Sequence, residues 1–402
     1  MLLLPHLRVL SAVVREGGIR PSSEPLLRAA SAISRSIALL ERHWGAQLFE
    51  RKAGGMLPTG IGRMVQARFE RASAELGAVL EEAAAARSKG ARDAAVTAVG
   101  VDALFDERRL LAASLLAELH HMPAVGLRLG ISQPAVSAVV SRLEGALGQR
   151  LFQRGARGMV PTDAGARWIR RFDRALAELR YLEADVAAAR GSMEGVVTVG
   201  TLPLARTQIL PAAVAALQAK HPRLRIHSLE SPYEELCAGL LSGKVDFIVG
   251  ALRPRLDRSL SSETLFADEL GLIAAAGHPL AQRRRLRLAD LRPYRWVLSR
   301  PGTPLRESLS NFFATHGEPA PVPAVETGDQ ALVRGLLLRA PMLTILSTRQ
   351  LRHEIDDGHL CVLPLPMEGL HRQIGLTTRA GAQLSAAAAG LIEQIRVSVG
   401  GE

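Results

Sequence analysis

The sequence predicts a multi-domain protein in which two similar, all-α units with long helices precede an α/β domain of two lobes. Three observations support this arrangement. A block of sequence recurs at a constant offset of 103 residues (144 − 41 = 103), and each copy ends in a long stretch with the apolar spacing of a helix. After Ser192, short strands alternate with helices instead.

The repeat contains no gaps and includes apolar, charged and glycine positions. In the first copy it comprises Glu41, Gly45, Leu48, Phe49, Arg51, Met56, Pro58, Thr59 and Gly62, which return as Glu144, Gly148, Leu151, Phe152, Arg154, Met159, Pro161, Thr162 and Gly165. The match extends further, because Arg68-Phe69 returns as Arg171-Phe172. Such a long match predicts duplication of one folded unit.

The net charge of +11 is concentrated in the repeated half of the chain. Residues 1–190 contain 27 Lys and Arg against 19 Asp and Glu, whereas the rest contains 23 (50 − 27) against 20 (39 − 19). Such a surplus favours a polyanionic partner such as nucleic acid. Alternatively, the many arginines reflect codon usage, so charge alone does not decide the function.

Cysteine content and hydropathy predict a soluble, cytoplasmic protein. Cys237 and Cys361 are the only cysteines and lie far apart, which argues against a disulfide framework and favours a reducing compartment. The first residues lack a signal-peptide pattern, and no apolar stretch reaches the about 18 residues of a membrane span. We therefore expect no membrane partner.

The second copy has the pattern of a helix-turn-helix. Helices are expected at 109–119 and 123–129, and Gly130 permits the left-handed turn that leads into the next helix. Ser132 suits the N-cap of that helix, and Pro134 falls in its first turn.

The outward side chains of this third helix, and the hairpin after it, suit contact with DNA. The amide of Gln133 can pair with adenine through two hydrogen bonds, and the hydroxyl of Ser137 can reach a phosphate or a base edge. A short strand that contains Arg154 leads to a basic turn at Arg157. We expect this turn to lie against the sugar-phosphate backbone.

These motifs resemble a known family. Ser-Gln-Pro-Ala-Val-Ser, Leu-Phe-x-Arg and Pro-Thr-x-Ala-Gly, which begin at Ser132, Leu151 and Pro161, are similar to the winged helix-turn-helix of LysR-type transcriptional regulators. The resemblance implies that both units bind double-stranded DNA. The expected DNA-binding residues are Ser132, Gln133, Pro134, Ser137, Arg142, Arg154 and Arg157 in the second copy, and Ser31, Ser34, Arg35, Arg51 and Lys52 in the first copy.

The first copy departs from the family pattern. Ala30 stands where the second copy has Gln133, and Pro21 and Pro25 fall in its expected second helix. Pro25 would strain the interior of that helix. We therefore expect the second copy to read bases, and the first copy to bind the DNA backbone or an altered sequence.

Each copy continues into a helix with a coiled-coil seam. The seam residues, spaced 4-3-4-3-4, are Val65, Phe69, Ala72, Leu76, Val79 and Ala83, then Trp168, Phe172, Ala175, Leu179, Leu182 and Val186. In LysR-type proteins the equivalent linker helix pairs antiparallel with that of another subunit. We hypothesise that the two linker helices here pair within one chain, whereas the alternative is pairing between subunits.

The C-terminal half predicts a parallel sheet with helices on both faces. Strands are expected at 196–199, 224–229, 245–250, 270–276, 322–325, 343–346 and 374–377, and helices at 209–220, 233–241, 305–316, 330–337, 349–356 and from Ser385 onward. The expected domains are winged units at 1–62 and 107–165, linker helices at 63–90 and 166–192, a connector at 91–106 and an effector-binding domain at 193–402. Its lobes are expected at about 193–270 with 375–402, and at about 271–374.

This half is similar to the effector domain of the same family, which resembles periplasmic solute-binding proteins. Open α/β sheets bind ligands beyond the carboxyl ends of their strands. The residues expected to bind an effector there are Thr201, Pro203, Ser231, Arg253, Ser299, Thr303, Arg306 and Thr327. Arg300 and Arg306 suit a carboxylate. The alternative for each threonine is a simple helix cap.

The sequence therefore predicts a sequence-specific DNA-binding transcriptional regulator controlled by a small-molecule effector, such as an organic acid, an aromatic acid or a sugar. The family implies RNA polymerase as a partner and a homo-oligomer, either dimer or tetramer. Phosphate-loop, nucleophile-elbow and zinc-protease motifs are missing, so we expect no enzyme and no cofactor. His353, Asp356, Asp357 and His359 are expected to be the exposed end of a helix and its following turn, and no metal site. The alternatives are a solute-binding protein or an architectural DNA-binding protein without ligand control.

Overall fold

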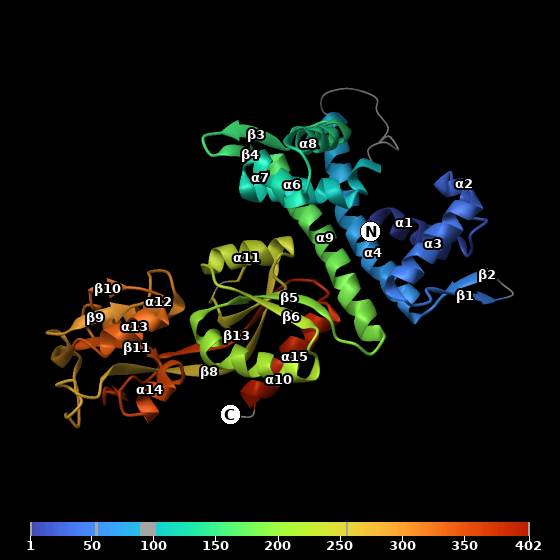
Figure 1. Cartoon of the computed structure of the whole chain (residues 1–402). Coiled ribbons are helices and arrows are strands. Elements are labelled where there is room, and N and C mark those ends of the chain that lie inside the picture. Colours follow the sequence, from blue (N-terminus) through green and yellow to red (C-terminus); the bar gives the residue numbers. More distant parts are fainter. Residues whose placement is uncertain (1, 53–54, 89–101, 255, 401–402) are drawn as a thin grey trace.

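The computed structural model describes residues 2–52, 55–88, 102–254 and 256–400. The chain begins with a helical unit, called here the first unit, that packs beside a second such unit, and an elongated α/β domain follows (Figure 1). The elements of the first unit are α1 (Leu4–Glu16), α2 (Ser23–Leu26), α3 (Ala30–Trp44), β1 (Phe49–Lys52), β2 (Gly55–Pro58) and α4 (Gly60–Ser88).

The second unit contains the same elements in the same order. They are α6 (Glu107–Leu119), α7 (Met122–Leu129), α8 (Gln133–Leu147), β3 (Phe152–Gly155), β4 (Gly158–Pro161) and α9 (Asp163–Ala189). In both units a two-stranded antiparallel hairpin lies between the third helix and the long helix. The connector predicted at 91–106 lies outside the described residues as far as residue 101.

Contacts that fix the local fold recur at the same offset of 103 residues. The carboxylate of Glu41 accepts the Leu48 N–H at 2.8 Å, and that of Glu144 accepts the Leu151 N–H at 2.8 Å. A Cβ atom on Gly165 would lie 2.0 Å from the carbonyl oxygen of Leu151, so this close approach requires glycine. These recurring residues therefore hold the hairpin against the helices, which explains why they are the same in both copies.

The second helix of the first unit is shorter than its counterpart. It has four residues, Ser23–Leu26, whereas α7 has eight. The short length of α2 agrees with the strain expected at Pro25. A proline has no backbone N–H, so it cannot donate the hydrogen bond that a longer helix would need. The helix ends at Leu27, which adopts a left-handed φ of 50°.

The long helices α4 and α9 pack along each other within the chain and share one apolar core. Every residue of the two predicted seams is buried. Arg68 pairs with Glu178 at 2.9 Å, and Arg171 pairs with Glu75 at 3.0 Å. Early residues of one helix thus contact late residues of the other, so the helices run antiparallel. Among the described residues, no helix has both the length and the apolarity required to cross a membrane.

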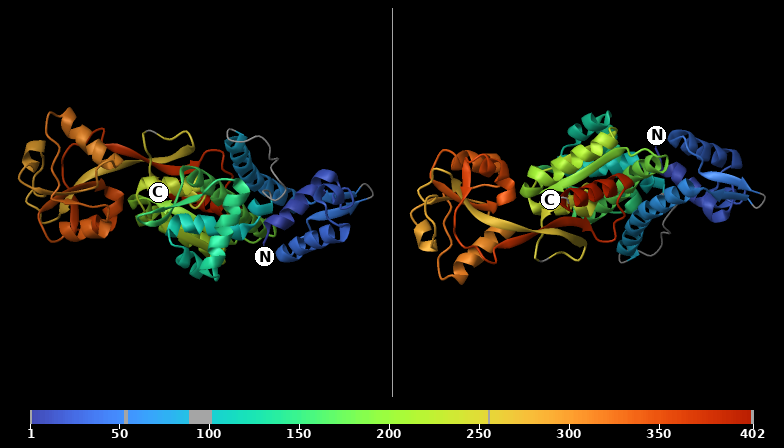
Figure 2. Two further views of the ribbon diagram at one scale, coloured as in Figure 1. Left: turned by 90° about the horizontal axis from the view of Figure 1, so that it is seen from above. Right: turned by 90° about the horizontal axis from the view of Figure 1, so that it is seen from below.

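The α/β domain is built on one mixed sheet in the order β10-β9-β11-β8-β13-β7-β5-β6, with β12 paired to β8. The strands are β5 (Gly195–Thr201), β6 (Leu224–Leu229), β7 (Phe247–Ala251), β8 (Leu260–Ala275), β9 (Arg295–Leu298), β10 (Val325–Glu326), β11 (Met342–Ser347), β12 (Leu360–Val362) and β13 (His371–Arg379). β8 and β13 pair antiparallel and run from one lobe into the other (Figure 2).

Helices cover both lobes, and each lobe has its own apolar cores. In the lobe nearer the linker helices they are the π-helical turn η1 (Ala205–Ile209), α10 (Leu210–Lys220), α11 (Tyr233–Ser242) and α15 (Ala386–Gly400). In the far lobe they are η2 (Leu288–Leu291), α12 (Pro304–Thr315), α13 (Gln330–Leu337), η3 (Thr348–Leu351) and α14 (Arg352–Asp356).

The sheet is mixed, whereas a parallel sheet was predicted: the strands expected near 268–276 and 372–377 to join the lobes do so as parts of β8 and β13, but they run antiparallel to their neighbours. The strand predicted at 322–325 begins later and is shorter in the structure, where Val325–Glu326 pairs with β9. β9 and β12 were not predicted, and β8 begins ten residues earlier than expected.

One set of contacts joins the α/β domain to α9 of the linker pair. The hydroxyl of Tyr181 donates to the Asp246 carboxylate at 2.6 Å, and Arg180 pairs with the same carboxylate at 3.0 Å. The equivalent positions of α4 hold Gly77 and Ala78, which have no side chain able to make these contacts. The two linker helices therefore differ at the positions that attach the α/β domain.

Candidate DNA-binding surface and effector cleft

The third helix of the second unit presents a polar face to solvent. Gly130 makes the left-handed turn before it with φ 65°, and the Ser132 hydroxyl accepts the Ala135 N–H at 3.4 Å. Gln133 and Pro134 are exposed and Ser137 is half-buried, whereas Val136, Val140 and Leu143 face the core. The structure thus leaves the predicted reading residues on the accessible face of α8.

The hairpin of the second unit carries exposed arginines beside this helix. Arg154 lies in β3 and Arg157 lies in the turn before β4, and both are exposed, as is Arg142 of α8. The backbone N–H of Met159 donates to the carbonyl of His120 at 2.9 Å, which ties the hairpin to the end of α6. Guanidinium groups held in this way suit the phosphates of a nucleic acid.

The first unit presents a different set of side chains on α3. Ser31, Ser34 and Arg35 are exposed, as the prediction requires. The backbones of Arg51 and Lys52 lie in β1, but their side chains lie outside the described part of the structure.

A cavity of about 800 Å³ lies between the two lobes of the α/β domain. It is lined by the residues predicted for effector binding, namely Thr201, Pro203, Ser231, Arg253, Ser299, Thr303 and Thr327, with the exception of Arg306. The carboxyl ends of β5, β7 and β9 and the loop after β10 open onto it. The cavity is large enough for a small organic molecule.

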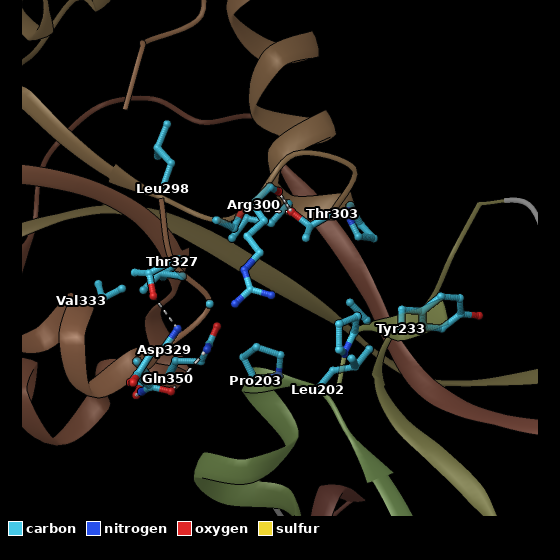
Figure 3. A pocket seen from close by; sticks show the side chains of 18 of the residues that line it. Leu202, Pro203, Tyr233, Leu298, Arg300, Thr303, Thr327, Asp329, Val333 and Gln350 are labelled. Carbon is cyan, nitrogen blue, oxygen red and sulfur yellow. Dashed lines mark hydrogen bonds between the residues drawn. The ribbon is translucent and has the colours of Figure 1, made fainter. Parts of the chain in front are cut away.

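Arg300 is the cation that points into this cavity from the far lobe, toward the side where Leu202 and Pro203 lie (Figure 3). Thr303 caps α12, because its hydroxyl accepts the Arg306 N–H at 3.3 Å, and it also lies 3.0 Å from the Ser299 hydroxyl. Arg306 does not line the cavity in this structure. Its guanidinium turns away, toward the Ser299 carbonyl and, at 3.8 Å, the Glu326 carboxylate.

Other lining residues were missed from the sequence. Arg206 lies in the π-helical turn after β5, a backbone irregularity that often marks functional sites. Arg372 pairs with the buried Asp268 at 2.9 Å and donates to the Gln350 side chain at 3.0 Å. Because Asp268 neutralises Arg372, the guanidiniums left to meet an anion, among the described residues that line the cavity, are those of Arg206, Arg253 and Arg300.

Two family models cover the chain. The model described as LysR substrate binding domain matches residues 190–399. The model described as bacterial regulatory helix-turn-helix protein, lysR family, matches residues 4–63 and again residues 108–166. The chain belongs to the LysR family. It is a transcriptional regulator with helix-turn-helix DNA binding and a substrate-binding effector domain, and its relatives are regulators and not enzymes.

Relatives differ in how much of this LysR-family chain they match. The HTH-type transcriptional regulator GalR of Pseudomonas putida is 42% identical over 397 residues, which is 98% of this chain and 97% of that protein. The uncharacterized regulator YdcI of Escherichia coli is 29% identical but covers 67% of this chain and 88% of its own length. The structure of full-length CbnR with its target DNA shares the fold, with 22% identity, a TM-score of 0.53 and coverage of 73% of this chain and 99% of that chain.

Proposed function

We propose that this regulator binds one DNA duplex through both of its N-terminal units, which form a duplicated pair of winged helix-turn-helix domains within a single chain. The antiparallel packing of α4 on α9 carries this proposal. It places the two units at opposite ends of one helix pair (Figure 1). The three helices and the hairpin of each unit, at residues 4–58 and 107–161, are called here its DNA-binding head. In this arrangement one chain supplies two heads, the number that a dimer of chains with one head each would supply.

The length of the linker pair fits a duplex. α9 has 27 residues and is therefore about 40 Å long at 1.5 Å per residue. Successive major-groove surfaces on one side of B-DNA are about 34 Å apart. Heads at the two ends of such a pair can thus enter neighbouring turns of the same groove.

Cross-linking tests whether the pairing is intrachain. Ala72 and Ala175 are both buried on the seam, and cysteines at these positions, in a chain with Cys237 and Cys361 changed to serine, report on the pair. We expect the disulfide-linked product to contain a single chain. Ala72→Cys alone is the control, because a chain with one cysteine cannot form a disulfide within itself. Products that contain exclusively two chains would overturn the intrachain pairing.

Base reading by the second unit is tested by comparing Gln133→Ala with Arg157→Ala. If Gln133 pairs with adenine, its loss costs about 1–3 kcal/mol and relaxes one position of the preferred sequence. Loss of a phosphate contact at Arg157 instead weakens all sequences alike and lowers the salt dependence of binding. Selection of bound duplexes from a random pool separates the two results.

We further propose that the cleft binds an organic anion, which brings the lobes together as expected for a domain that resembles periplasmic solute-binding proteins. Arg300 of the far lobe and Arg206 and Arg253 of the near lobe support an acid over a sugar. Thermal-shift measurements with organic acids, aromatic acids and sugars test this. Arg300→Gln should abolish the shift and Arg306→Gln should retain it, whereas a shift with sugars alone would favour the neutral class.

A chain in which none of these compounds changes either thermal stability or DNA binding would favour the alternative of an architectural DNA-binding protein. For the regulator we propose a cytoplasmic homo-oligomer that contacts RNA polymerase, as the family implies. A dimer of this chain would present four heads, which is the number in a tetramer of single-headed chains. Sedimentation of the protein bound to DNA distinguishes the dimer from a tetramer.

A further inference from the structure

We infer that this regulator recognises two half-sites of different sequence in inverted orientation, one read by α3 and the other by α8, so that a single chain binds its DNA in one direction only. This inference rests on the proposed function, because it requires both units to contact one duplex. A symmetric homodimer reads two identical half-sites. The two heads of this chain differ on the surface that meets DNA.

The buried positions of the two reading helices have kept the same character. Ile33 and Ile37 of α3 are buried, and so are Val136 and Val140 at the equivalent positions of α8. These aliphatic side chains all belong to the same apolar core. The framework that holds each helix in place is therefore equivalent in the two units.

Three positions outside this core have changed chemistry instead, whereas Ser34 and Ser137 are the same residue in both copies. In the repeat, Ala30 is equivalent to Gln133, Ser31 to Pro134, and Arg35 to Ala138. Glutamine pairs best with adenine, arginine pairs best with guanine, and alanine offers only an apolar contact. Two helices with these side chains prefer different bases at the matching positions of their half-sites.

The symmetry of the linker pair sets the orientation of the half-sites. The contact between Arg68 and Glu178 recurs as that between Arg171 and Glu75, with the roles of the two helices exchanged. Such reciprocal contacts relate the units by an approximate two-fold axis. The half-sites are therefore inverted, although their sequences differ.

The direction of binding fixes where the effector domain lies. That domain attaches to α9 through Arg180 and Tyr181, and α4 has Gly77 and Ala78 at the equivalent positions. Because each pair of heads carries one effector domain, the complex with DNA is asymmetric. An asymmetric DNA site thus determines on which side of the site this domain is placed.

Selection from a randomised duplex pool with the purified full chain provides the test. We expect enrichment of two unlike, inverted half-sites. A duplex with one half-site of each kind should bind about 5- to 150-fold more tightly than either palindrome made from them, the range that one bidentate base contact provides. Enrichment of a palindrome, or of one half-site beside random sequence, would overturn the inference and leave DNA binding by the regulator in place. A chain that enriches no duplex would contradict the proposed function itself.

A head-conversion variant gives a second readout. Ala30→Gln, Ser31→Pro and Arg35→Ala together copy the face of α8 onto α3, and the preference should move to the palindrome of the second half-site. Lys220→Gln removes one positive charge on the exposed end of α10 and should leave the preference unchanged. An unchanged ranking of the duplexes in the triple variant would contradict the inference.

The reciprocal conversion keeps the test decisive if the first variant does not fold. Gln133→Ala, Pro134→Ser and Ala138→Arg copy the face of α3 onto α8, where Gln133, Pro134 and Ala138 are exposed. This variant should prefer the palindrome of the first half-site. Circular dichroism shows which variants are folded, and a folded variant that keeps the wild-type ranking would contradict the inference.

Discussion

Arg68 and Arg171 occupy equivalent positions of the two linker helices, but only Arg68 also holds the effector domain. Each arginine pairs with two carboxylates of the opposite helix. The Arg68 guanidinium additionally donates to the carbonyls of Gln383 and Leu384, at 2.7 and 2.8 Å. Its side chain is 4% exposed and that of Arg171 is 31% exposed, so the same contacts lie in different surroundings.

Arg68→Met should therefore be far more damaging than Arg171→Met. Removing one partner from a buried ion pair costs about 3–5 kcal/mol, because Glu178 and Asp185 remain buried with fewer partners. A partly exposed pair contributes about 1 kcal/mol or less. Thermal unfolding and amide exchange near Ala386, whose N–H donates to Asp185, measure the difference. Equal losses in the two variants would show that burial at this junction does not matter.

Tyr181→Phe should loosen the effector domain from the linker pair. The hydroxyl donates to the Asp246 carboxylate at 2.6 Å, and burial together with that carboxylate raises the pKa of the tyrosine. Without it, buried Asp246 loses one donor and keeps Arg180 and the Thr198 N–H, a loss of about 1–3 kcal/mol. Tyr294→Phe in the far lobe is the matched control. Limited proteolysis of the domain junction should accelerate in the first variant alone.

The sequence predicted the second unit well because each of its boundaries has a local chemical cause. Gly130 and Ser132 set the start of α8 wherever the unit is placed. The beginning of β8 has no such signal. Residues 260–269 are mostly polar and largely exposed, and they form a strand only because β13 pairs with them. The sequence of residues 260–269 therefore lacks the apolar alternation that would predict a strand, since their strand conformation depends on a partner that is distant in sequence.

The sequence predicted those residues of the cleft that follow the carboxyl ends of parallel strands. Thr201 and Ser299 follow from that rule, because the carboxyl ends of parallel strands meet at one edge. Arg372 was missed because β13 is antiparallel, so its beginning lies at the edge where the parallel strands end. Arg306 was expected at the cleft but lies outside its lining, because its side chain turns toward Glu326, a contact that the sequence does not reveal.

Leu27→Gly should stabilise the first unit. Leu27 has φ 50°, a left-handed conformation that costs a side chain about 1–2 kcal/mol, and its side chain is 91% exposed, so little packing is lost. Glycine offsets about 0.5–1 kcal/mol of this relief, because its backbone loses more conformational entropy on folding. The net gain in the free energy of unfolding is therefore about 0.5 kcal/mol. Gly130→Leu, at the equivalent position with φ 65°, should lose a similar amount. Urea unfolding curves that shift in the same direction for both would refute this explanation.

Glu107→Gln should weaken the pH dependence of stability. The Glu107 carboxylate accepts the N–H groups of Leu3 and Leu4 at the start of α1, and burial raises its pKa despite these bonds. Between the ordinary pKa of a glutamate and this raised pKa, the folded chain holds a proton that the unfolded chain has released. Its contribution to stability is therefore present at acidic pH and is lost as the pH rises through that window.

The neutral amide that Glu107→Gln introduces has no proton to lose, so the variant should gain stability relative to the parent chain as the pH rises from about 4 to 7. Urea midpoints at several pH values measure this difference, which cancels the titration of all other groups. The substitution Glu24→Gln, at an exposed glutamate of the first unit, is the matched control. A difference between Glu107→Gln and the parent that stays constant across this range would mean that the Glu107 carboxyl titrates alike in the folded and unfolded chains.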